Sequence, residues 1–212
     1  MSAATMFVPK APPVSRWLVW LMITWAAICL GYYCQAKPAP RAVQARNAQL
    51  TIDWLTGRLW VREATGRNDG PGVADIIRAG GGVPAQRPEW CGFTQAADNR
   101  AYKLPIPRNG MQGAARAWFP LTGPDAERTL FHRAAGVGSI DSIRLGLQAG
   151  FDYGRGIHHV AKVAKLGRPV RAGRAPRNVY TLAGNEGSGT NAGLKLTLYP
   201  IGSIDALGNW LY

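Results

Sequence analysis

The spacing of apolar residues predicts helices in the first half of the chain beyond residue 47. Over 48–64, apolar side chains recur at helical intervals, at Leu50, Ile52, Leu55, Leu59 and Trp60. The turn-forming stretch 66–72 ends this helix, and three glycines at 80–82 end a second short helix over 73–79. Two further helices are predicted, over 91–102 and 112–119.

Strands are predicted to dominate the second half of the chain. Glycine-rich loops separate four apolar segments with strand-like composition, over 139–147, 157–166, 179–183 and 194–199. Helices that precede strands along a chain are typical of an α+β fold with an antiparallel sheet. We therefore expect the N-terminal helices of one domain, 48–212, to pack on such a sheet.

The N-terminal segment has a different composition. Residues 17–33 are uncharged and mostly apolar, and about 17 residues is the short end of what spans a bilayer. The region 1–36 is therefore interpreted as a transmembrane anchor, with a cleaved signal segment or a buried core helix as alternatives. Residues 37–47, rich in Pro, Ala and Arg, are expected to be a linker.

The net charge and the number of cysteines indicate which partners, disulfides and metal sites the domain can have. The formal charge is +13, and residues 48–212 alone contain 20 basic and 12 acidic residues, which favours a polyanionic partner. Cys91 is the single cysteine of that region and has no partner there for a disulfide or a multi-cysteine metal site. The sequence contains no P-loop, dinucleotide fingerprint or zinc-ligand spacing, so we expect no cofactor and no metal.

Cys91 opens a predicted helix, where backbone N–H groups and the helix dipole stabilise a thiolate. A thiolate nucleophile needs a base and a group that orients the base. His158 and His159 begin one predicted strand, and Asn185 and Glu186 follow another. Neighbouring antiparallel strands place such residues side by side, whereas His132 is expected to lie in a surface loop.

Short motifs in this order resemble a CHAP domain, a cysteine, histidine-dependent amidohydrolase/peptidase of the papain-like NlpC/P60 superfamily. The resemblance covers about residues 60–187. Glu63, Asn68, Gly70 and Pro71 resemble the family's opening motif, and Trp90-Cys91 resembles its nucleophile element. The segment 104–118 resembles the loop and helix that follow, and segments 157–160 and 182–185 resemble the strands that carry the other two catalytic residues.

The resemblance implies a peptidoglycan hydrolase, an amidase or endopeptidase that acts through a thiol acyl-enzyme. It assigns Cys91 as nucleophile, His159 as general base and Asn185 as the orienting residue. Trp90, His158 and Glu186 are expected to contact substrate. Ala183 and Gly92 depart from the family pattern. A phage or prophage lysin and a bacterial wall-remodelling enzyme both fit, with the catalytic domain outside the cytoplasm, or secreted if the N-terminus is cleaved.

A run of basic residues follows the histidine strand. Lys162, Lys165, Arg168, Arg171, Arg174 and Arg177 occur at every third position without an intervening acid. The run is interpreted either as a solvated loop or as a contact with an anionic envelope polymer. Nucleic acid is the less favoured partner, because no aromatic residues are interleaved. The alternative to an enzyme is a membrane-anchored, non-catalytic CHAP-like module that binds an anionic surface or a partner protein.

Overall fold

The computed structural model of the chain describes residues 17, 20, 24, 25, 40–108, 110–168 and 174–212. Its contacts divide the chain into Met1–Pro38 and Ala39–Tyr212, and every element below belongs to the second unit. The expected membrane anchor over 1–36 lies almost wholly outside the described residues. Among the residues that are described, no helix is both long and apolar enough to cross a membrane.

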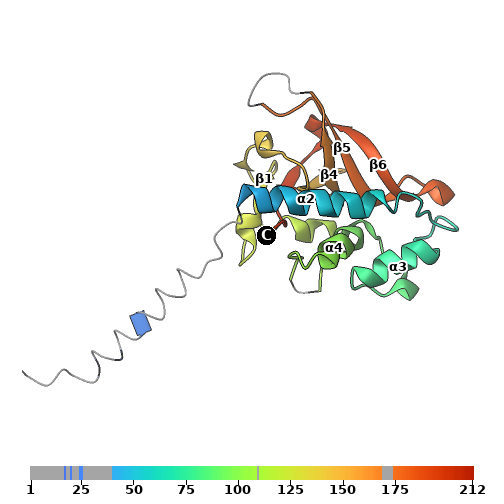
Figure 1. Cartoon of the computed structure of the whole chain (residues 1–212), viewed down its shortest axis with the longest axis horizontal. Helices are drawn as coiled ribbons and strands as arrows, with labels where there is room; N and C mark the ends of the chain where they lie inside the picture. Colours follow the sequence, from blue (N-terminus) through green and yellow to red (C-terminus); the bar gives the residue numbers. More distant parts are fainter. Residues whose placement is uncertain (1–16, 18–19, 21–23, 26–39, 109, 169–173) are drawn as a thin grey trace, which may run out of the picture. The chain divides into compact units, whose positions relative to one another are not determined.

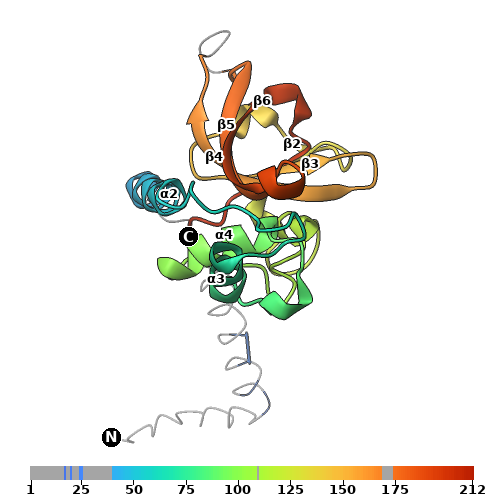
Figure 2. The same ribbon diagram turned by 90° about the vertical axis from the view of Figure 1, so that its right-hand side faces the viewer.

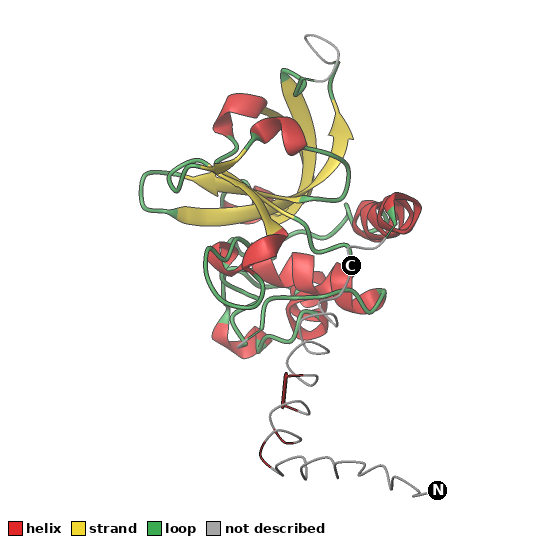
Figure 3. Ribbon diagram, turned by 90° about the vertical axis from the view of Figure 1, so that its left-hand side faces the viewer, coloured by secondary structure: helices red, strands yellow, loops and turns green. Residues whose placement is uncertain are grey.

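Seven antiparallel strands form one sheet in this unit, which confirms the predicted α+β class. The strands are β1 (Thr129–His132), β2 (Val137–Gly138), β3 (Gln148–Asp152), β4 (Ile157–Leu166), β5 (Asn178–Glu186), β6 (Gly193–Pro200) and β7 (Ala206–Gly208). Their order in the sheet is β2-β1-β7-β3-β4-β5-β6. Strands and α-helices occupy separate layers (Figure 3).

Three α-helices precede the sheet in the described sequence: α2 (Arg41–Thr56), α3 (Pro71–Ala79) and α4 (Cys91–Ala101). Figures 1 and 2 show α3 and α4 together on one side of the sheet, with α2 running beside them. Proline at the first position of α3 suits a helix start, because its missing N–H would have no intrahelical partner there. Gly80, Gly81 and Gly82 follow the helix, and Gly81 adopts φ 87°.

Helix α2 begins at Arg41, so residues 41–47 are helix and not the expected linker. Pro40 directly precedes its first turn, and the first half of the helix is anchored by tertiary contacts. The Asn47 amide donates to the carbonyl of Leu211 at 2.8 Å, and Gln44 accepts from Arg144 at 3.1 Å. These long-range hydrogen bonds could not be read from a segment rich in Pro, Ala and Arg.

Three other predictions about local structure differ from the observed elements. The predicted strand over 139–147 is wrong, because Ser139 accepts a hydrogen bond from the Asp141 N–H and starts a 3-10 turn over Ile140–Ser142. The predicted helix over 112–119 is reduced to a 3-10 turn, Ala115–Trp118. His132 lies on β1 and is partly buried, contrary to the surface loop expected for it. The remaining predicted helices and strands are present, β4 with the expected bounds and the others with shifted ends.

Strand β4 is covered on both faces. Four consecutive residues, 160–163, are fully buried, and Val160 packs in the apolar cluster that contains Cys91 while Val163 packs with the far core. The Nζ of Lys162 lies 2.8 Å from the Asp98 carboxylate of α4 and donates to Asn99 at 3.0 Å. Lys162 is therefore not part of an exposed basic run, which corrects that prediction.

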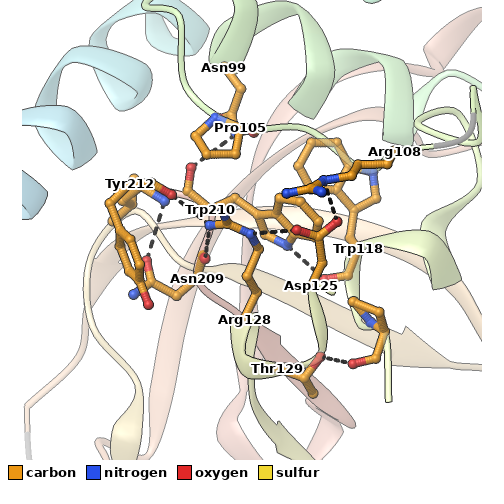
Figure 4. A network of polar contacts seen from close by, with 12 residues as sticks. Asn99, Pro105, Arg108, Trp118, Asp125, Arg128, Thr129, Asn209, Trp210 and Tyr212 are labelled. Carbon is orange, nitrogen blue, oxygen red and sulfur yellow. Dashed lines mark hydrogen bonds and ion pairs between the residues drawn. The ribbon is translucent and has the colours of Figure 1, made fainter. Parts of the chain in front are cut away.

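The C-terminal segment fixes the loop next to α4. Trp210 packs edge-on against Trp118, with ring centroids 5.4 Å apart, and its indole N–H donates to the Trp118 carbonyl at 2.8 Å. Figure 4 shows this contact beside Arg128, which pairs with Asp125 at 3.2 Å and donates to the Tyr212 carbonyl at 2.6 Å. Both tryptophans belong to the same apolar cluster as Cys91, so this network supports the residues that pack around Cys91.

The buried pair gives a stability prediction. Burial raises the pKa of Asp98 to about 6 and lowers the pKa of Lys162, so desolvation offsets much of the attraction between the two charges. Lys162→Met leaves the carboxylate without its partner, and we expect a loss of about 3–5 kcal/mol in the free energy of unfolding. Lys162→Met combined with Asp98→Leu should recover most of that loss, as measured by urea denaturation.

The matched control is Lys165→Met, since Lys165 lies on the same strand but is exposed. This substitution should change stability by less than about 0.5 kcal/mol. If the double variant loses as much stability as Lys162→Met and Asp98→Leu lose in sum, the two side chains do not stabilise each other.

Candidate active site

Cys91 is the first residue of α4, as its place in the sequence predicted. Its side chain is nearly enclosed, because the residue is 2% exposed, and Sγ lies 4.0 Å from the carbonyl oxygen of His158. The next residue has no room for a side chain: a Cβ at Gly92 would lie 2.3 Å from the carbonyl oxygen of Gly113. The departure from the family pattern at position 92 therefore has a steric cause.

The residue before Cys91 is held by a buried carboxylate. The Trp90 indole N–H donates to Glu63 at 2.9 Å, and the second oxygen of Glu63 accepts from the backbone N–H of Asn68 at 2.9 Å. Asn68 in turn donates to the carbonyl of Arg87, in the segment that leads to α4. Trp90 is 0% exposed, so its side chain is not open to a substrate in this structure, and its hydrogen bond to Glu63 holds it at the start of α4.

His159 lies between Cys91 and an acidic partner. Its Nε2 is 3.0 Å from Oε1 of Glu186, and both side chains are largely buried. The hydroxyl of Tyr199 is 3.2 Å from each carboxylate oxygen of Glu186 and donates to that carboxylate. Phe151 packs against both rings, 5.9 Å from His159 and 4.4 Å from Tyr199 between ring centroids.

The electrostatics of this group favour a charged imidazole. Burial alone would lower the pKa of His159, but hydrogen bonds to Cys91 and Glu186 and the negative charges of both raise it to about 10. Burial and then the charge of Glu186 also raise the pKa of Tyr199, so its hydroxyl stays protonated and remains a donor. The negative charge and hydrogen bond of Glu186 therefore favour the protonated form of the imidazole.

Asn185 does not occupy the position that the resemblance gave it. It adopts the left-handed conformation, φ 60°, where the pairing of β5 with β6 shifts register between Ala183 and Glu186. Asn tolerates this conformation better than most residues, and such irregularities re-aim side chains beside functional sites. His159 consequently donates its hydrogen bond to Glu186, which the sequence had suggested only as a substrate contact.

The site thus brings together Cys91, His159, Glu186 and Tyr199 from α4, β4, β5 and β6. No protein-family model, curated protein or solved structure matches the chain. The roles of these residues therefore rest on their geometry and charge. Tyr199 was not found from the sequence, because its only signal is a strand position whose partner in space is not apparent along the chain.

The remaining residues singled out from the sequence are His158 and the run of basic residues, and most of them are exposed. The His158 side chain is exposed, points away from His159 in the strand alternation, and contacts the carbonyl of Gly156 through Nδ1. Lys165, Arg168, Arg174 and Arg177 are exposed, although Arg174 pairs with Asp141 at 3.2 Å. Arg171 lies outside the described residues.

The raised pKa of His159 gives a first prediction for the site. Glu186→Gln removes a negative charge that stabilises the imidazolium, so the His159 proton should be lost at a pH about 1–3 units below the wild-type value. Nitrogen-detected NMR of the imidazole across the pH range measures this. The exposed Glu127→Gln should leave the titration unchanged, and identical curves for Glu186→Gln and wild type would contradict the pairing.

The backbone role of Asn185 gives a second prediction. Asn185→Gly should leave the His159 titration and the fold unchanged, because glycine adopts a positive φ without strain. Asn185→Val should disturb both, since a left-handed conformation costs a branched residue about 1–2 kcal/mol. If Asn185→Gly instead shifts the His159 titration as strongly as Glu186→Gln does, the amide and not the backbone orients the histidine.

Proposed function

We propose that the chain is a papain-like cysteine hydrolase, similar to CHAP domains, that cleaves amide bonds in peptidoglycan. The observation that carries the proposal is the His159 imidazole, held between the Cys91 thiol at the start of α4 and the Glu186 carboxylate. The order of Cys91, His159 and residue 185 or 186 along the chain is that of papain-like enzymes.

In the proposed reaction the Cys91 thiolate attacks the carbonyl carbon of an amide. The first N–H groups of α4 have no intrahelical acceptors, and they can donate to the oxyanion that develops. The His159 imidazolium donates its proton to the leaving amine as the thioester forms. Neutral His159 then takes a proton from water, which attacks the thioester and releases the acid. Glu186 and Tyr199 hold the imidazole in place and stabilise its charged form.

The choice of peptidoglycan rests on the resemblance of the opening motif and on the charge of the domain. Glu63, Asn68 and Pro71, which carry that motif, act in this structure to seat α4 and to start α3. The exposed Lys165, Arg168 and Arg177 present positive charge toward solvent, which favours contact with an anionic envelope surface. The proposal requires the domain to act outside the cytoplasm.

The test of the activity is direct. The full chain should release soluble, amine-containing fragments from purified peptidoglycan, and Cys91→Ser should reduce the rate by at least about 10³-fold. Circular dichroism checks that the variant folds. Cys29→Ser together with Cys34→Ser is the matched control, since the proposed reaction gives these cysteines no role, and it should retain the activity. Equal release by wild type and Cys91→Ser would show that Cys91 is not the nucleophile.

A second candidate function is a non-catalytic CHAP-like module, and the 2% exposure of Cys91 favours it. Alkylation by iodoacetamide distinguishes the two. An enzyme should react at Cys91 faster than a free thiol at pH 6, whereas a sealed structural cysteine should react more slowly than a free thiol over pH 5–8.

A further inference from the structure

A groove of about 550 Å³ runs alongside the proposed catalytic residues. Glu89 and His158 line it, two residues before Cys91 and one residue before His159. Ala115, Phe119 and Ile157, which also line it, pack in or against the apolar cluster that contains Cys91. The His158 carbonyl is 4.0 Å from Sγ, so a residue that lines the groove also contacts Cys91.

Two arginines on this groove have no acidic partner. Arg116 and Arg155 are both exposed, and within the described part of the chain neither forms an ion pair. Arginines near acidic residues elsewhere are paired, as Arg128 is with Asp125 and Arg133 with Asp205. The guanidinium groups in the groove are therefore free to bind a carboxylate, for which their planar donor geometry is suited.

The segment that carries Arg155 is held in a fixed turn. One carboxylate oxygen of Asp152 accepts the backbone N–H groups of Gly154, Arg155 and Gly156 at 2.7, 3.0 and 3.0 Å. Asp152 also lines the groove, and these three bonds hold its Oδ1 in the turn. A preorganised loop lowers the entropic cost of binding a ligand through Arg155.

Glu89 is the one acidic residue on the groove that no described side chain or backbone group pairs with. Its charge opposes the binding of a carboxylate near Cys91 and favours an ammonium there. Apolar side chains, including Phe119 and the 47%-exposed Leu121, supply the remaining contact surface. A ligand that fits this groove has carboxylates, an amine and short apolar side chains.

We infer that Arg116 and Arg155 determine specificity by binding free carboxylates of the substrate, so that the site selects an acidic peptide over its amidated form. The inference rests on the proposed function for the identity of the peptide. A peptidoglycan stem peptide carries the required groups, because its D-glutamate and terminal D-alanine have free carboxylates and its diamino acid has a free amine. Amidation of those carboxylates removes the charge and keeps the shape.

Binding tests this without requiring turnover. The full chain with Cys91→Ala is titrated calorimetrically with the stem pentapeptide L-Ala-γ-D-Glu-L-Lys-D-Ala-D-Ala and with the same peptide amidated at both carboxylates. The free acid should bind about tenfold or more tightly, which corresponds to the net gain from one well-formed charged contact. Arg116→Gln and Arg155→Gln should each reduce this preference, and Glu89→Gln should strengthen binding of the acid.

The matched control is Arg46→Gln, which makes the same change of charge at an exposed arginine of α2 that does not line the groove. It should leave the preference unchanged. Equal affinity for the two peptides, no binding of either, or an equal effect of Arg46→Gln and Arg116→Gln would overturn the inference. Because the assay uses a variant without the thiol, a failure of the proposed hydrolysis appears separately, as activity that does not depend on Cys91.

Discussion

The structure depends on the way α4 is fixed to β4. A fully buried ion pair, Asp98 to Lys162, joins the helix to the strand, and Glu63 holds Trp90 at the start of the helix. A buried ion pair contributes little net stability, but any packing of helix and strand that separates the two charges is strongly disfavoured. They therefore fix the register of α4 on the sheet, and that register places the Cys91 thiol beside the His159 imidazole.

Much of the fold could be predicted from local patterns. Helix α3 lies between a turn cluster and three glycines, and β4 is a long apolar segment, so both were placed correctly. Strand β7 has only three residues, too few for a periodic pattern, although it pairs with both β1 and β3. Lys162 could not be recognised as buried for a similar reason. It belongs to a run with a basic residue at every third position, which favours exposure, and its buried partner Asp98 comes from α4, far away along the chain.

The candidate site was predictable only in part, for a reason that lies in the backbone. Cys91 and His159 are recognised by residue type and position, and the structure brings them together. The choice between residues 185 and 186 depends on a left-handed residue and a register shift, which no side-chain pattern reveals. With Glu186 in place of an amide, the histidine is held by a full negative charge, and its pKa rises to about 10.

In the proposed mechanism Cys91 forms a covalent bond to substrate, with His159 as its proton carrier. Acid quenching of the full chain during turnover of peptidoglycan fragments, followed by mass spectrometry of its proteolytic peptides, can detect this bond. We expect a hydroxylamine-labile thioester on the peptide that contains Cys91. Cleavage of the substrate with no adduct at Cys91, or with an adduct at another residue, would contradict it.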